Sequence, residues 1–111
     1  MLNVRKLLAA MALIAPLAQA ATPVTLYKSP TCGCCEEYVK YLQANGFDVK
    51  AINSDDMNRI KETNHVGNLG SCHTALINGY VVEGHVPVAA ILKVLKQRPK
   101  IVGISVPGMT T

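Results

Sequence analysis

Three cysteines lie within four residues of the chain, in the run Cys32-Gly33-Cys34-Cys35, between a predicted strand and a predicted helix. The strand is the β-prone run 24–27, which Ser29-Pro30 ends. Apolar residues then recur at the i, i+3, i+4, i+7 spacing of one helix face; they are Cys35, Tyr38, Val39 and Leu42. Free N–H groups and the positive end of the dipole lower thiol pKa values at a helix start. We therefore expect reactive thiolates at this junction.

The rest of the chain alternates strand and helix patterns. Residues 47–52 read as a second strand and residues 57–61 as a short helix behind N-cap residues. Asn78-Gly79 joins two further strands, 74–77 and 80–83, because both positions of that hairpin turn need positive φ. We expect Pro87 to be the first residue of a last helix, which Pro99 ends. Its predicted apolar stripe consists of Val88, Ile91, Leu92 and Leu95. Residues 101–106 are either a further strand or a packed tail.

The order β-α-β-α-β-β-α predicts the fold class. A βαβ unit forms a parallel strand pair with a right-handed crossover, and the hairpin adds an antiparallel pair. The expected architecture is α/β and thioredoxin-like, with a mixed four-stranded sheet and helices on both faces. The cysteine loop occupies the junction where that fold keeps its reactive thiols.

The first twenty residues have the order of a secretory signal peptide. Arg5 and Lys6 precede the apolar run 7–17, and Ala18-Gln19-Ala20 has the small-x-small pattern of a cleavage site. We expect residues 1–20 to be removed on export and residues 21–111 to form one domain without a membrane anchor. Export places the thiols in an oxidising compartment. Nine basic and seven acidic residues then remain, with few aromatic residues, so we expect no nucleic-acid partner.

The cysteine spacing is open to three interpretations. Cys32 and Cys35 have the C-x-x-C spacing of a thiol-disulfide oxidoreductase, but Cys34 would compete in every exchange step. Two structural disulfides are hard to build when Cys34 and Cys35 are adjacent and only Cys72 is distant. Clustered thiolates suit a soft metal, and their close spacing strains a single tetrahedral zinc site. An iron–sulfur cluster is not expected after ordinary export, so copper remains.

Cys72 supplies a fourth sulfur from a distant part of the chain. It lies just before the strand 74–77, and in a thioredoxin-like fold that turn faces the C-x-x-C loop. The turn usually carries a cis-proline, but here His73 takes the matching position. The substrate-clamping feature of a thioredoxin is thus missing where a fourth thiol is present, which favours a metal site over an oxidoreductase.

Four motifs together resemble a known family. They are the run 27–35, Ser71-Cys72-His73-Thr74, the run 79–87 and Val106-Pro107-Gly108-Met109. This combination is similar to the CopG-type periplasmic copper-resistance proteins. The resemblance implies a periplasmic location, a thioredoxin-like fold and a role in copper resistance. It also implies a multinuclear Cu(I) cluster bridged by Cys32, Cys34, Cys35 and Cys72, with redox activity toward copper. The implied partners are copper ions and other exported copper-handling proteins.

Four further residues are weaker candidates as ligands. Met109 lies in a Pro-Gly turn, where its thioether could reach Cu(I), or it is simply a terminal methionine. Met57 lies in the first turn of a predicted helix, where core packing is the alternative. His73 and His85 are expected either to touch or tune the metal or to shape their loops. Whether the protein is an enzyme stays open, with copper oxidoreductase and thiol-disulfide oxidoreductase as the alternatives.

Overall fold

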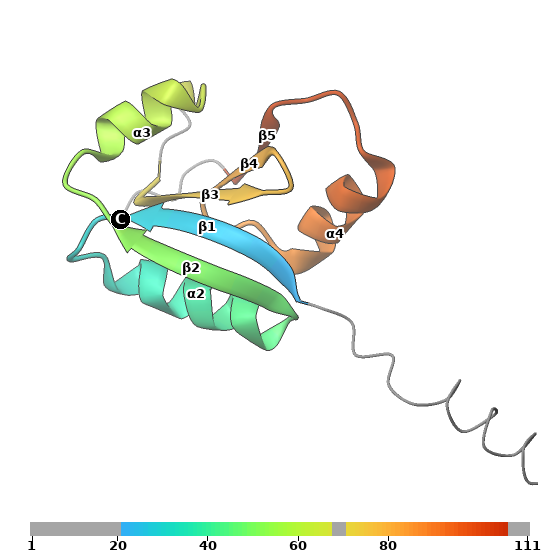
Figure 1. The fold of residues 1–111 in the computed structure, drawn as a ribbon, viewed down its shortest axis with the longest axis horizontal. Helices are drawn as coiled ribbons and strands as arrows, with labels where there is room; N and C mark the ends of the chain where they lie inside the picture. The colour runs from blue at the N-terminus through green and yellow to red at the C-terminus, as the bar shows by residue number, and fades with distance from the viewer. Residues whose placement is uncertain (1–20, 68–70, 107–111) are drawn as a thin grey trace, which may run out of the picture.

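The structure, a computed structural model, describes residues 21–67 and 71–106. Figure 1 shows one curved sheet with helices packed against it. The elements in chain order are β1 Thr22–Lys28, α2 Gly33–Ala44, β2 Phe47–Asn53, α3 Met57–Thr63, β3 His73–Ile77, β4 Tyr80–Glu83, α4 Val88–Gln97 and β5 Gly103–Ser105. The order of the elements through β4 and α4 is the predicted one.

The sheet is mixed and has the strand order β2-β1-β3-β4-β5. β1 pairs parallel with β2 and antiparallel with β3, as the βαβ unit and the hairpin require. Asn78 and Gly79 both have positive φ, so the turn between β3 and β4 is the one predicted. The α/β class and the mixed sheet are confirmed.

The sheet has five strands rather than the expected four. The segment 101–106 contains β5, which pairs parallel with β4, with Gly103 opposite Val81. A Cβ atom at Gly103 would overlap the Val81 carbonyl group, so glycine permits this close pairing. The strand is only three residues long and weakly patterned, which is why the sequence left its state open.

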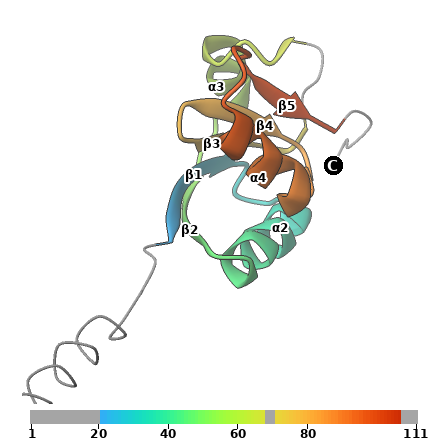
Figure 2. The same cartoon turned by 90° about the vertical axis from the view of Figure 1, so that its right-hand side faces the viewer.

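Helices cover both faces of the sheet, as expected (Figures 1 and 2). α2 and α4 share one face, where the hydroxyl of Tyr38 on α2 donates to the carbonyl of Val86, just before α4. α3 lies on the opposite face, where Lys61 reaches the Thr74 hydroxyl on β3. The core lies between the sheet and the α2–α4 face, and the four predicted apolar residues of α2 are its buried side.

Two expectations for the last helix are wrong. Leu92 is 52% exposed, whereas Val88 and Ile91 are buried and Leu95 packs against the core. The buried side of this ten-residue helix follows the i+3 and i+7 positions after Val88, so the i+4 position lies at the surface. Pro87 is the N-cap residue, with extended ψ of 144°, and not the first helical residue.

Three sequence predictions concern residues outside the described part of the chain. They are the signal peptide in residues 1–20, its cleavage site and the Met109 ligand. Within residues 21–67 and 71–106, no helix has both the length and the apolar character needed to cross a membrane.

Candidate metal centre

The cysteine loop sits at the start of α2 because of the local sequence. Ser29-Pro30 ends β1, and the backbone N–H of Cys32 donates to the Ser29 carbonyl at 3.2 Å, closing a turn. Cys32 is the N-cap residue of α2, so Cys34 and Cys35 occupy the first helical turn. The thiols therefore lie where the backbone N–H groups of a helix are unpaired.

The fold brings all four cysteines together. Their sulfur atoms lie within 4.8 Å of one another. Cys32 and Cys35 are joined by a disulfide, with Cα atoms 5.4 Å apart. The Cys34 sulfur lies 3.3 Å from that of Cys32 and 3.1 Å from that of Cys72. The prediction that Cys72 lies beside the Cys32–Cys35 loop is confirmed by these sulfur positions.

The cluster is accessible from one side. Cys35 is fully buried and its sulfur lies 3.5 Å from the Cys72 carbonyl oxygen. The other three are half-buried, and a pocket of about 380 Å³ opens over them, lined by Ser29, Thr31, Cys32, Gly33, Cys34 and Cys72. Burial, together with the hydrogen bond to Cys34, raises the pKa of the Cys72 thiol to about 11. Cys72 is therefore a protonated thiol at neutral pH, and a metal binding there must displace its proton.

The two candidate histidines lie behind Cys72 in an aromatic stack with Tyr38. The His73 ring is fully buried, 4.8 Å from the Tyr38 ring and 5.3 Å from the His85 ring. His73 Nε2 hydrogen-bonds the Gly84 carbonyl at 3.0 Å, and burial lowers the pKa of His73. Among the described residues, His73 Nδ1 and His85 Nε2 have no hydrogen-bond partner. His73 thus shapes the turn with one nitrogen and keeps the other free.

An ion pair between a buried lysine and an exposed glutamate spans the cysteine loop. Lys28, at the end of β1, is only 4% exposed, and its Nζ lies 2.8 Å from Glu36 Oε1 in the first turn of α2. This hydrogen bond and the Lys28 charge lower the pKa of Glu36. The pair connects the residues on either side of the loop, so it restrains the segment that carries three of the four thiols.

Two solved structures are similar to this chain in both fold and sequence. Both are described as the copper resistance protein CopG, form 1 and form 2, and each is 39% identical to this chain. Form 1 has a TM-score of 0.70, with 82% of this chain and 78% of that chain covered. Form 2 has a TM-score of 0.71, with 82% and 79% covered. The chain belongs to the CopG family of copper resistance proteins.

Two other comparisons add little to the CopG assignment. A family model described as "Protein of unknown function, DUF411" matches residues 69–111, which include Cys72 and its strand. No curated protein matches the chain significantly. The family resemblance inferred from the four motifs is thus confirmed by the CopG structures.

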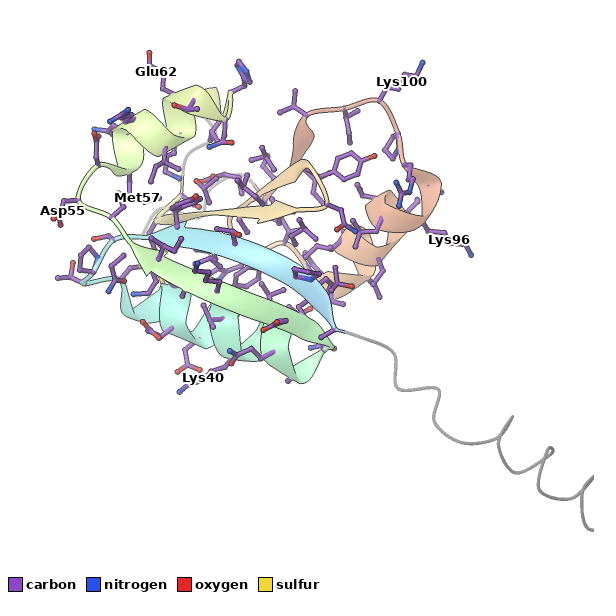
Figure 3. The ribbon with its side chains drawn as sticks, in the orientation of Figure 1. Lys40, Asp55, Met57, Glu62, Lys96 and Lys100 are labelled. Carbon is purple, nitrogen blue, oxygen red and sulfur yellow. A yellow bond between two sulfur atoms is a disulfide. The ribbon has the colours of Figure 1, made fainter. Side chains whose placement is uncertain are left out.

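Met57, a candidate ligand predicted from the sequence, has a defined position in the structure of this CopG-family chain. It is the first residue of α3, separated from the end of β2 by residues 54–56, and is half-buried. Figure 3 shows it at the ends of β1 and β2, the edge of the sheet from which the cysteine loop also leaves. Its role as a ligand stays a prediction, as does that of Met109.

Sequence reasoning missed the charged residues that surround the cysteines of this CopG-family chain. Lys28 and Glu83 are both almost fully buried. Lys28 pairs with Glu36, and Glu83 pairs with Lys61 of α3. A signal was present, because a charged residue ends each of two apolar strand patterns, at Lys28 and at Glu83. The partner of Glu83 could not be predicted from sequence spacing, since Lys61 is 22 residues away from it.

Proposed function

We propose that this chain is an exported copper-binding protein that acts in copper resistance. It holds Cu(I) on the thiolates of Cys32, Cys34, Cys35 and Cys72, in a cluster with bridging sulfurs. Residues 1–20 direct it to the periplasm and are removed there. The observation that carries the proposal is the convergence of four sulfur atoms within 4.8 Å, one of them from a distant segment that precedes β3.

The donor set supports copper. A metal–thiolate bond is about 2.3 Å long, so sulfurs within twice that distance can share metal ions. Every pair in this cluster lies within that limit or close to it, since all four sulfurs are within 4.8 Å of one another. Soft thiolates favour Cu(I), zinc and iron–sulfur clusters, and vicinal cysteines suit bridged Cu(I) better than one tetrahedral zinc. The two CopG structures are described as copper resistance proteins, which supports the same metal.

Ligands beyond the cysteines belong to the same proposal. Met57 and Met109 offer thioethers, and His73 and His85 offer buried imidazole nitrogens without partners among the described residues. They complete the coordination of outer copper ions or tune the cluster from behind Cys72.

A competition experiment tests the function. Protein recovered from the exported fraction is reduced without oxygen and offered equal Cu(I) and Zn(II), and the bound metals are counted. We expect more than one copper per chain and no zinc, and no metal on a control with all four cysteines changed to serine. One zinc per chain without copper would overturn the proposal.

The disulfide between Cys32 and Cys35 favours a second candidate, thiol-disulfide exchange. In that reaction the reduced pair gives up two electrons to a substrate disulfide, closing its own bond as two substrate thiols form. Copper-free reduced protein should then reduce a peptide disulfide at a rate that Cys72→Ser leaves unchanged. Absence of turnover with wild type would remove this candidate.

A further inference from the structure

A buried carboxylate is surrounded by hydrogen-bond donors beside the cysteine cluster. Glu83, at the end of β4, is 2% exposed. Its Oε2 accepts from the Ser71 backbone N–H and the Ser71 hydroxyl, both at 2.6 Å, and from Lys61 Nζ at 2.5 Å. Its Oε1 accepts from the Thr74 hydroxyl at 2.6 Å. Both oxygens of this carboxylate are therefore occupied.

The partner Lys61 is committed to the same segment. Besides Glu83, its ammonium group donates to the Thr74 hydroxyl at 3.0 Å and to the His73 carbonyl at 3.4 Å. The pair thus holds the backbone on both sides of Cys72, at the Ser71 N–H and at the His73 carbonyl. A buried ion pair adds little to stability on average, so what it holds in place is the more informative property.

The sheet itself does not hold Cys72. β3 begins at His73, where the last pairing with β1 is made, and its first pairing with β4 joins Thr74 to Glu83. Ser71 and Cys72 lie beyond the ladder, so their backbone groups need other partners. The side chain of Glu83 supplies the partner for Ser71. On the other face of the sheet, the carbonyl of the next residue, Gly84, accepts from the His73 ring.

We propose that Glu83, paired with Lys61, is a positioning residue for Cys72. Its carboxylate holds Ser71 through the backbone N–H and the hydroxyl, and Lys61 holds the His73 carbonyl, so that the Cys72 sulfur between them stays 3.1 Å from that of Cys34. Glu83 touches no sulfur and acts through Ser71. The proposal rests on the proposed function only in that the positioned sulfur is one of the copper ligands.

Disulfide closure reports the position of Cys72 without any metal. In metal-free protein with the Cys32–Cys35 bond closed, Cys34 and Cys72 are the two free thiols. Diamide oxidises them: the two sulfurs bond, their two protons and two electrons pass to the diazene, and a hydrazine forms. The rate of this closure depends on the distance between the two sulfurs, and mass mapping follows it.

The test compares Glu83→Gln with wild type under these conditions. We expect closure of Cys34–Cys72 to slow by about tenfold or more, since a misplacement of about 1 Å can slow a proximity-dependent reaction a hundredfold. Glu62→Gln is the matched control, because Glu62 is an exposed carboxylate of α3 that points away from the sheet (Figure 3). It should close at the wild-type rate.

A second variant covers the case in which Glu83→Gln fails to fold. Lys61→Met combined with Glu83→Gln removes both charges together, which avoids an unpaired buried charge. It should fold and also close slowly. Slow alkylation of the buried Cys35 in reduced protein verifies folding in each variant. A purely structural role would lower the melting temperature and leave closure in the folded state unchanged.

The outcomes separate this inference from the proposed function. Wild-type closure rates in folded Glu83→Gln or in the double variant would overturn the positioning role. Slow closure with normal copper content in wild type supports both ideas. If Glu83→Gln closed slowly but the wild-type protein bound no copper, only the proposed function would be rejected, since the closure assay contains no metal.

Discussion

The sulfur atoms of Cys34 and Cys72 lie 3.1 Å apart although 38 residues separate them in the chain. Cys34 is held by the first turn of α2, and Cys72 by the segment that leads into β3. β1 links the two, because it precedes the cysteine loop and pairs with β3, with Lys28 opposite His73. The cluster is therefore assembled by the sheet, and neither segment alone contains it.

Loss of Cys72 should impair copper binding as severely as loss of Cys32. In Cys72→Ser and Cys32→Ser alike, a bridging thiolate becomes a hydroxyl, which is a poor ligand for Cu(I). Copper per chain is measured at equal folded content, with Thr31→Ala, which alters the pocket lining without removing a sulfur, as the control. Normal loading of Cys72→Ser would confine the copper site to residues 32–35.

Copper binding and disulfide formation should exclude each other. Closing the Cys32–Cys35 bond removes two of the four thiolates, because disulfide sulfurs lack the charge that Cu(I) needs. Oxidised metal-free protein should lose most of its copper capacity and regain it after reduction, while copper-loaded protein resists the oxidant for longer. Thiols and copper are counted on the same samples. Full capacity with the mapped disulfide intact would make histidine and methionine the principal ligands.

The substitution Glu36→Gln should destabilise the metal-free protein more at neutral pH than at acidic pH. The pKa of Glu36 is lowered from 4.5 by Lys28, so its contribution is present above that value and is lost as pH falls through the lower, folded-state pKa. The difference in melting temperature between wild type and Glu36→Gln should thus be largest near about pH 7 and shrink toward about pH 3.

The neighbouring residue provides the control for this pH dependence. Glu37 pairs with Lys40 at 3.6 Å, and both side chains are more than two-thirds exposed. Exposed pairs contribute little to stability, so Glu37→Gln should match wild type across the same range. If Glu36→Gln and Glu37→Gln showed the same pH dependence of the melting temperature, the Lys28–Glu36 pair would not contribute to stability.

Tyr38→Phe should lower the free energy of unfolding by about 1–3 kcal/mol, because it leaves the carbonyl of Val86 buried without its donor. The Tyr38 side chain is 3% exposed and its hydroxyl donates at 2.7 Å. Tyr41→Phe is the comparison, since Tyr41 is 40% exposed and water can replace its bond to the Val88 N–H. Urea unfolding measures both, and equal losses would contradict this reasoning.

Local pattern was enough to predict most elements of the fold. The i, i+3, i+4, i+7 spacing identified the buried side of α2, and Asn78-Gly79 identified the hairpin, since each depends on residues close in the chain. The same reasoning was wrong for Leu92 and left the fifth strand undecided. Which side of α4 meets the sheet, and whether 103–105 finds a partner, depend on surfaces formed by distant residues.

The sequence by itself determined which atoms can form the site: four sulfurs, three of them in one turn at a helix start and one before a strand. Only the tertiary structure decided how they are held. Lys28 of β1 pairs with Glu36 of α2, and Glu83 of β4 pairs with Lys61 of α3 and with Ser71. Charge alone does not select these partners among the other carboxylates and amines of the chain. The physical reason is that a buried charge, such as that of Lys28 or Glu83, is destabilising without an oppositely charged partner, and this burial exists only after the chain has folded.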